Sequence, residues 1–591
     1  MTRFAVWAPR PAGVELVLDG ERLPMRSDAD SGWWRLDVDV PSGGTTYAFS
    51  LDGGEPRADP RGMRLPDGLH GFSCTFDPGE FGWTDDGWSG RPLEGSVVYE
   101  AHVGTFTPGG TLDSAVERLD HLVELGADVV ELLPLATFPG RHNWGYDGAA
   151  PYSVHETYGG PVALQRFVDA AHGRGLAVCL DVVYNHLGPD GNYLPEFGPY
   201  FTDVHPTPWG KAVNLDGPGS DEVRGWVLDN AEQWLRDFHV DGLRLDAVHA
   251  LHDERALPIL EEMSARVDRL SEELGRRLWL VAESDRNDPG TVTPRGTPEG
   301  LAVAGWGVHA QWADDIHHAL HVALTGETQG YYADFAGPDA LAKVMRTPFF
   351  HDGTWSSFRG RAHGRPVDVS SLPGWRFVGF LQDHDQVGNR AAGDRLSARL
   401  SPGRLACGAA ILLCSPYTPM LFMGEEWGAS TPWQFFTDHT DPEIAAATAA
   451  GRVAEFVEHG WDESVVPDPQ DPATFERSKL DWSELDAPPH ARLLEFYRAL
   501  IALRRERKGL RDARLELADV SWDAGSGRFT MQRGEHVVLV NLGHERLAFD
   551  FEGEVLLSWD PLDPGGPGTP GQTVLPPDSA AILASPPSRA L

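Results

Sequence analysis

The sequence has few cysteines: Cys74, Cys179, Cys407 and Cys414 are the only four in 591 residues. They lie far apart in the chain, and three of them stand in strongly apolar surroundings. This arrangement is typical of buried free thiols rather than of a disulfide framework or a zinc site. We therefore expect a reducing compartment.

Long apolar runs are also missing. No run approaches the roughly 18 residues that indicate a membrane-spanning helix. The stretch MTRFAVWAPRPAG at the N-terminus has no basic segment followed by an apolar one, so a secretory signal peptide is disfavoured as well. We expect a cytoplasmic protein that does not have a membrane as its partner.

Basic residues are scarce beside acidic ones. The chain has 49 Lys and Arg against 88 Asp and Glu, which gives a formal net charge of -39. Nucleic acid would be repelled by this charge, so it is not an expected partner and a neutral substrate fits better. An equally good explanation is that the acidity only keeps the protein in solution. The 20 Trp residues would suit stacking against sugar rings, although Trp is more often part of a core.

The length predicts roughly two to four domains. Residues 1–92 show short alternating runs separated by Gly, Pro and Asp, which predicts an N-terminal β-sandwich that resembles a carbohydrate-binding module. Alternating runs return in residues 511–591 and predict a C-terminal antiparallel β domain.

Between these two regions, residues 93–510 alternate apolar strands with amphipathic helices. Eight strands can be counted if LAVAGW, residues 301–306, is taken as the sixth. The pattern predicts a closed (β/α)₈ TIM barrel rather than an open sheet, since no glycine-rich dinucleotide fingerprint follows the first strand. The insertion 187–221 after the third strand is far longer than such loops usually are, so we expect it over the barrel mouth with a functional role.

Charged side chains gather where the predicted strands end, which is where barrels of this type place their catalytic groups. The opposite strand ends carry no comparable set. Arg244 and Asp246 are two residues apart and share a face of one strand, so the guanidinium would keep the carboxylate ionised. Glu283 follows the apolar run LWLVA, where desolvation would raise its pKa. The full set is Asp181, Asn185 and His186 after strand three; Arg244, Asp246 and His249 at strand four; Glu283 at strand five; and His384 and Asp385 at strand seven.

One ionised and one protonated carboxyl group are the pair that glycoside hydrolysis uses. Four segments at these strand ends resemble the ordered motifs of the α-amylase superfamily of retaining α-glucan enzymes. They are DVVYNH (181–186), GLRLDAVH (242–249), WLVAES (279–284) and FLQDHD (380–385). The resemblance implies that Asp246 is the nucleophile, Glu283 the general acid/base, and Asp385 the carboxylate that stabilises the transition state.

The same resemblance assigns the surrounding residues. It implies that Arg244 orients Asp246, and that His186 and His384 contact sugar hydroxyls. Tyr146, in HNWGYDG, resembles the aromatic platform under that sugar, although a packed loop tyrosine is an equally good reading of the residue alone. Asp181 matches a position that is most often structural.

An N-terminal sandwich before the barrel narrows the resemblance to the branching, debranching and trehalose-forming members. Four segments resemble the trehalose-releasing ones, namely 207–224, 282–289, 311–335 and 380–391. This implies hydrolysis of the α-1,4 bond next to the terminal trehalose of a neutral, trehalose-capped α-glucan oligosaccharide, after a synthase has formed that cap. The alternatives are a glycogen branching or debranching enzyme on the same scaffold, or a non-catalytic glucan-binding protein. The presence of all three acids argues against the last.

Specificity for trehalose needs groups beyond the scissile bond. Trp209, Trp312, Asp314 and Asp315 are candidates because they combine stacking faces with hydroxyl acceptors, and His249 is a further substrate-binding candidate. The competing interpretation makes the tryptophans core residues and the aspartates helix N-caps.

We expect no metal and no cofactor. The acids of the third-strand insertion, Asp190, Asp203 and Asp216, show no regular ligand-loop spacing. His317, His318 and His321 stand at helical spacing but have no Cys or Glu partner at ligand spacing.

Overall fold

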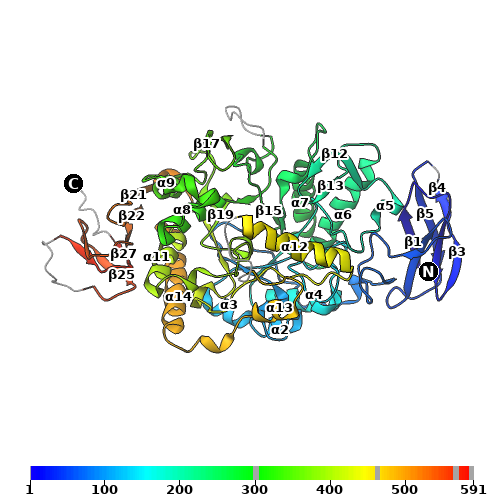
Figure 1. Cartoon of the computed structure of the whole chain (residues 1–591), viewed down its shortest axis with the longest axis horizontal. Helices are drawn as coiled ribbons and strands as arrows, with labels where there is room; N and C mark the ends of the chain where they lie inside the picture. Colours follow the sequence, from blue (N-terminus) through cyan, green and yellow to red (C-terminus); the bar gives the residue numbers. More distant parts are fainter. Residues whose placement is uncertain (1, 29, 297–304, 459–465, 563–570, 585–591) are drawn as a thin grey trace.

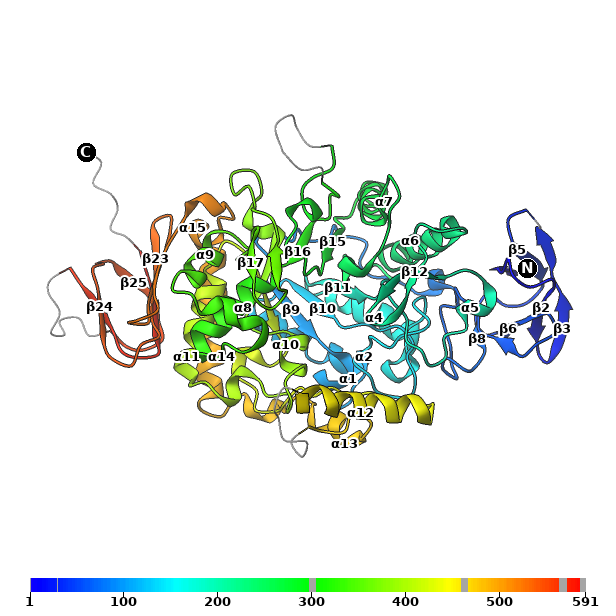
Figure 2. The same cartoon turned by 45° about the horizontal axis from the view of Figure 1, so that its top comes forward.

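The computed structural model describes residues 2–28, 30–296, 305–458, 466–562 and 571–584. Figure 1 shows a central barrel with the N-terminal sheets (blue) at one end of the long axis and the C-terminal sheet (red) at the other. The turned view in Figure 2 keeps the two terminal modules at opposite ends. Among the described residues, no helix is both long and apolar enough to cross a bilayer.

The N-terminal region consists of two antiparallel sheets, as predicted. One has the order β1-β5-β4, and the other has the order β3-β2-β6-β7 with β8 beside β6. Phe4, Leu16 and Phe49 are among the side chains buried in this region. The strands are β1 (Thr2–Trp7), β2 (Val14–Leu18), β3 (Glu21–Pro24), β4 (Arg26–Asp28), β5 (Trp33–Val38), β6 (Thr46–Leu51), β7 (Pro56–Arg57) and β8 (Ser73–Cys74).

Eight parallel strands close into a barrel, which confirms the predicted (β/α)₈ architecture. The sixth strand was assigned wrongly from the sequence. It is β16 at 310–312 and not LAVAGW, of which residues 301–304 lie outside the described part of the chain. The apolar character of LAVAGW is shared by any buried segment, and a three-residue strand is too short to show a periodicity. The barrel strands are β9 (Val98–Ala101), β10 (Val129–Leu132), β11 (Ala177–Val182), β14 (Gly242–Leu245), β15 (Trp279–Ala282), β16 (Ala310–Trp312), β19 (Phe377–Phe380) and β20 (Thr418–Phe422).

The main barrel helices bury their apolar faces against the strands. Helix starts follow the expected chemistry: Ser401 accepts a hydrogen bond from the Arg404 N–H, and Pro402 occupies the first turn of α11. The helices around the barrel are α2 (Leu112–Val116), α3 (Leu119–Leu125), α4 (Gly160–His172), α6 (Ser220–Asp237), α7 (Ile259–Leu274), α8 (Asp314–Thr325), α9 (Ala340–Arg346), α11 (Pro402–Leu413) and α14 (His490–Glu506). Shorter or peripheral ones are α1 (Val103–Phe106), α5 (Leu194–Phe197), α10 (His384–Gly388), α12 (Pro442–Glu458), α13 (Pro472–Arg477) and α15 (Lys508–Arg511).

The C-terminal domain is antiparallel, as predicted. Its main sheet has the order β21-β22-β23-β27-β25, and β24 pairs with β26. The remaining hairpins, β12 with β13 and β17 with β18, belong to barrel loops. These strands are β12 (Phe201–Thr207), β13 (Gly210–Val213), β17 (Thr354–Ser356), β18 (Arg361–His363), β21 (Ala518–Asp523), β22 (Arg528–Arg533), β23 (His536–Asn541), β24 (Leu547–Phe549), β25 (Glu554–Ser558), β26 (Thr573–Leu575) and β27 (Ser579–Ala584).

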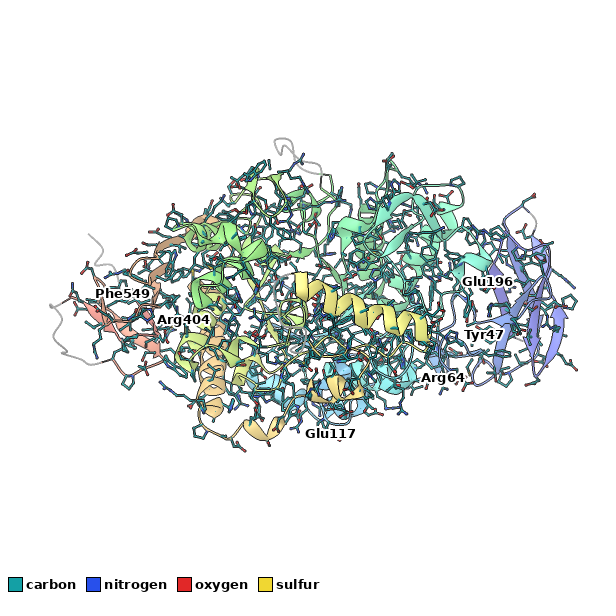
Figure 3. The ribbon with its side chains drawn as sticks, viewed as in Figure 1. Tyr47, Arg64, Glu117, Glu196, Arg404 and Phe549 are labelled. Carbon is teal, nitrogen blue, oxygen red and sulfur yellow. The ribbon has the colours of Figure 1, made fainter. Side chains whose placement is uncertain are left out.

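Polar contacts join the terminal modules to the barrel. Arg404 of α11, labelled in Figure 3, donates to the Asp578 carboxylate (2.9 Å) and to the Leu542 carbonyl (3.2 Å) of the C-terminal domain. At the other end, Arg57 donates to Glu196 of α5 (3.0 Å), and Glu196 is also labelled in Figure 3. The third-strand insertion therefore contacts the N-terminal module as well as the barrel.

The register of the barrel strands brings polar side chains together. Asp181 of β11 is the register partner of Arg244 in β14, and both side chains are buried. Since alternate residues of a strand face the same side, Arg244 and Asp246 both point toward the barrel axis at the carboxyl rim. The site is built on this rim.

Gly242 shows how tightly the strand that carries Arg244 is packed. It is the register partner of Trp279, and a Cβ at position 242 would stand 2.2 Å from two carbons of the Trp279 ring. We expect Gly242→Ala to destabilise the protein by about 1–3 kcal/mol through overpacking. Thermal unfolding followed by circular dichroism measures this.

The matched control is Gly225→Ala in α6, where a Cβ would meet nothing within 4 Å. There Ala should be neutral or raise stability by roughly 0.5–1 kcal/mol, because helix interiors favour Ala over Gly. Equal melting temperatures for the two variants would contradict the packing argument.

Candidate active site

Arg244 is the centre of the site. It is fully buried, and one face of its guanidinium lies 4.3 Å from the Trp312 ring centroid. Its Nη1 donates to Asp181 Oδ2 (2.9 Å) and to Asp246 Oδ1 (2.8 Å), while Nη2 donates to Glu283 Oε2 (2.9 Å). A planar fork of donors holds three carboxyl groups from three neighbouring strands in fixed relative positions. Trp312 is a buried floor under Arg244, as the core interpretation of this tryptophan predicts.

Asp246 is held as a carboxylate. Besides Arg244, its Oδ2 accepts a hydrogen bond from the Asn185 side-chain amide (2.6 Å). Burial alone would raise its pKa, but Arg244, His186 and the Asn185 hydrogen bond together bring the pKa below the ordinary value. The group is therefore ionised at neutral pH, as a nucleophile must be.

Glu283 has the opposite electrostatic environment. Its pKa is raised to about 8, mainly by burial. Arg244 lowers the pKa, whereas the negative charges of Asp246 and Asp385 raise it further. Its Oε2 also accepts a hydrogen bond from the Ala247 N–H (2.8 Å). Ala247 adopts φ +40°, a conformation that is uncommon for a residue with a side chain, directly after Asp246. The strained turn thus aims a backbone donor at Glu283.

Asp385 stands at the start of α10, and its side chain is 42% exposed. The short helix is capped by Asp383, whose Oδ1 accepts from the N–H groups of Asp385 (2.9 Å) and Gln386 (3.0 Å). Burial raises the pKa of Asp383 well above its usual range. The two acids of FLQDHD therefore differ: Asp383 supports the helix, while Asp385 faces the open part of the site.

The rings of Tyr146 and His384 stack on each other in the site. Their rings are nearly parallel, with centroids 5.2 Å apart, and the Tyr146 hydroxyl donates to Asp181 Oδ2 (2.7 Å). His384 Nε2 lies 2.8 Å from that hydroxyl and 3.6 Å from Asp385 Oδ2. The structure thus places both predicted substrate-binding residues beside Asp385.

The third-strand insertion reaches the site through Trp209. This side chain is 47% exposed at the turn between β12 and β13, and its ring stacks on His186 with centroids 4.9 Å apart. The Nε2–H of His186 donates to the Tyr146 carbonyl (3.0 Å). A largely exposed indole beside a site histidine is a ready stacking surface for a sugar ring.

Two further predicted residues lie at the edge of the site. His249, in the turn after Asp246, has its Nδ1 3.9 Å from Asp285 Oδ1, and burial lowers its pKa. Asp315 is buried, and its Oδ2 accepts from Asn287 (2.8 Å) and from the N–H groups of Phe350 (2.8 Å) and His351 (3.0 Å). Asp315 does not cap α8, because Ala313 occupies the N-cap position.

Asp314, next to Asp315, is only half-buried, and burial raises its pKa to about 6. The negative charge of Asp385 raises the pKa of Asp314 further.

The acids of the third-strand insertion point to different partners. Asp190 accepts from Thr440, Asp203 pairs with Lys211, and Asp216 accepts from His205. Among the described residues, no group of three or more His, Cys, Asp or Glu side chains is arranged to hold a metal ion. His317 instead donates its Nδ1–H to the Leu381 carbonyl (2.7 Å) inside the fold.

Sequence reasoning missed Glu100. It lies in the middle of the first barrel strand, is 1% exposed, and accepts hydrogen bonds from the backbone N–H of His384 (3.0 Å) and from its Nδ1–H (2.6 Å). The signal was present, because a glutamate inside the apolar run VVYEAHV is unusual for a buried strand. It went unused because we considered only the residues on which the strands end.

Two parts of the chain match known protein families. Residues 70–199 match the family described as "Alpha amylase, catalytic domain", and residues 515–582 match "Domain of unknown function (DUF3459)". A crystal structure described as a putative α-amylase from Salmonella typhimurium has a TM-score of 0.89 and 37% identity, covering 99% of this chain and 97% of that one.

Two curated relatives are more similar in sequence. The malto-oligosyltrehalose trehalohydrolase of Arthrobacter ramosus is 57% identical over 570 residues, which is 96% of this chain and 97% of the relative. The enzyme of the same name from Rhizobium sp. (strain M-11) is 55% identical over 98% of this chain and 97% of its own length. The chain therefore belongs to the malto-oligosyltrehalose trehalohydrolase family, within the α-amylase superfamily.

Proposed function

We propose that this protein is a retaining glycoside hydrolase that cleaves the α-1,4-glucosidic bond next to the terminal trehalose of malto-oligosyltrehalose, releasing trehalose and a malto-oligosaccharide. One observation carries the chemistry: a single buried guanidinium joins an ionised Asp246 to a Glu283 whose pKa is raised to about 8. Membership of the family supports the substrate.

The reaction is a double displacement. Glu283 donates its proton to the glycosidic oxygen while Asp246 attacks the anomeric carbon, so the glycosidic bond breaks and a glycosyl ester forms. Glu283, now a carboxylate, takes a proton from water while the water oxygen attacks the anomeric carbon. The bond to Asp246 breaks, the Asp246 carboxylate is released, and the sugar keeps its configuration. We expect the two carboxyl groups to lie about 5–5.5 Å apart, as in other retaining enzymes.

The remaining residues bind and orient substrate in this proposal. Asp385 accepts sugar hydroxyls and stabilises the positive charge of the transition state, and Arg244 orients Asp246. Tyr146 and Trp209 offer aromatic faces. His186, His384 and His249 supply polar contacts. Asp315 contributes through the 350–351 loop that it holds, because its Oδ2 is already occupied.

The substrate is a neutral, trehalose-capped glucan, so a synthase that forms the trehalose cap must act first. A cytoplasmic location is part of the proposal, and the four cysteines, all free and buried, are consistent with a reducing compartment. The competing enzyme function is a branching or debranching enzyme on the same scaffold. Incubation with maltotriosyltrehalose separates the two, since free trehalose supports our proposal, whereas α-1,6 bonds made or cut without it support the alternative.

Substitution of Asp246 tests its role as the nucleophile. Asp246→Asn keeps the shape of the side chain but removes its charge, so trehalose release should fall at least about 10⁴-fold. The measurement is trehalose released from maltotriosyltrehalose, with circular dichroism to show that the variant is folded. A folded variant that retains a tenth of the activity would refute the assignment.

The protonation states of Glu283 and Asp246 predict a pH profile. The reaction needs Glu283 protonated and Asp246 ionised, so kcat/KM should fall about tenfold per pH unit above the Glu283 pKa of about 8. Activity should persist on the acidic side until Asp246 is protonated, below the usual pKa of Asp. A pH profile of kcat/KM tests this, and an alkaline limb centred below pH 6 would show that Glu283 is not the acid we describe.

The exposed ring of Trp209 predicts a contribution to substrate binding. If its exposed ring stacks on the substrate, Trp209→Ala should raise KM about tenfold, which corresponds to about 1.4 kcal/mol of lost binding. Trp209→Phe should recover much of this affinity because it keeps a flat ring. The control is Trp355→Ala, another exposed tryptophan (65%), on the β17 hairpin. Unchanged KM in Trp209→Ala would remove this residue from the site.

A further inference from the structure

Glu100 connects two strands that are not neighbours. It lies on β9, whereas His384 follows β19, and β20 separates these strands in the barrel order. The hydrogen bonds from His384 to Glu100 therefore run inside the barrel, below the rim. Both Glu100 oxygens are engaged, one by the His384 backbone N–H and the other by Nδ1–H. This two-point contact fixes both the position of the His384 backbone and the rotation of its ring.

The second ring nitrogen of His384 begins a chain of hydrogen bonds. Its Nε2–H donates to the Tyr146 hydroxyl (2.8 Å), which donates to Asp181 Oδ2 (2.7 Å), and that oxygen also accepts from Arg244 (2.9 Å). Because a carboxylate only accepts and the Tyr146 proton is directed to Asp181, both nitrogens of His384 must carry protons. This direction of the chain requires an imidazolium.

The groups around His384 agree with this charge. Burial alone would lower its pKa, but Asp385 and Glu100 raise it to about 10. His102 is neutral, since burial lowers its pKa to about 3. The titratable groups that face the ring are Glu100 on β9, His102 before α1, Tyr146 after β10, Asp181 on β11, and Asp383 and Asp385 on either side of it.

We propose that Glu100 is a positioning residue that keeps His384 charged at neutral pH and thereby sets the direction of the hydrogen-bond chain leading to Arg244. A neutral His384 has only one N–H. If that proton stays on Nδ1, Nε2 becomes an acceptor, and the Tyr146 hydroxyl turns to donate to it instead of to Asp181. Asp181 then loses a donor, and the site loses a cation beside Asp385. Glu100 prevents this rearrangement at neutral pH.

The effect on turnover rests on the proposed function, but the charge of His384 does not. The test variant is Glu100→Gln, which keeps the shape and one acceptor oxygen. Protein labelled with ¹³C at histidine Cε1 reports protonation by NMR, and His384→Asn identifies the His384 signal by its loss. In the wild type we expect no titration of His384 between pH 6 and 8.5. In Glu100→Gln the signal should titrate within that range, near the ordinary histidine value of about 6.5.

The activity profile provides the second readout. Relative to the wild type, Glu100→Gln should release trehalose almost normally at pH 5.5 but about tenfold more slowly at pH 8. Its active form needs a proton on His384 that the wild type keeps throughout this pH range. A merely structural role would lower activity equally at all pH values. This activity arm depends on trehalose release, whereas the NMR arm decides the inference even if another product is formed.

Glu131→Gln is the matched control. Glu131 is the register partner of Glu100 on the next strand, is 3% exposed, and its pKa is raised to about 8 by burial and by Glu100. It makes no contact with His384 among those the structure describes, so Glu131→Gln should leave the His384 signal and the pH profile as in the wild type. A His384 that stays charged in Glu100→Gln, or that titrates equally in both variants, overturns the proposal.

Discussion

The site depends on one buried cation. Arg244 lies at the barrel axis without contact with water, and a lone charge there would be costly to desolvate. Asp181, Asp246 and Glu283 offset this cost by accepting its hydrogen bonds, so none of the three can move without leaving a donor unpaired. The same contacts that stabilise the guanidinium hold the two proposed catalytic carboxyl groups on either side of one planar group.

The acids around Arg244 do not share one protonation state. Several are too deeply buried for all of them to be ionised, and the pKa values of Glu131 and Glu283 are raised to about 8. Asp246 stays ionised because Arg244, His186 and Asn185 all favour its charged form. The pKa values of Asp246 and Glu283 therefore differ because the barrel interior holds few positive charges and these act more strongly on Asp246.

A second cation, His384, complements the first. Glu100 and Asp385 face it from opposite sides, and Tyr146 links it through Asp181 to Arg244. Strands far apart in the sequence are thus joined by hydrogen bonds beneath the rim. This polar layer explains why a barrel whose walls are apolar has acids in the middle of its strands and not only at their ends.

Much of this was accessible from the sequence, because the residues on which strands end must meet at one rim of a parallel barrel. The alternation of strands and helices predicted the barrel, and this rule predicted the grouping of Asp246, Glu283 and Asp385. It could not locate the three-residue sixth strand. It also could not show that Asp315 is occupied by backbone donors, that Trp209 stacks on His186, or that Glu100 contacts His384. The identity and order of the proposed catalytic groups are local properties of the sequence, whereas contacts across the barrel depend on register and side-chain direction, which only the tertiary structure decides.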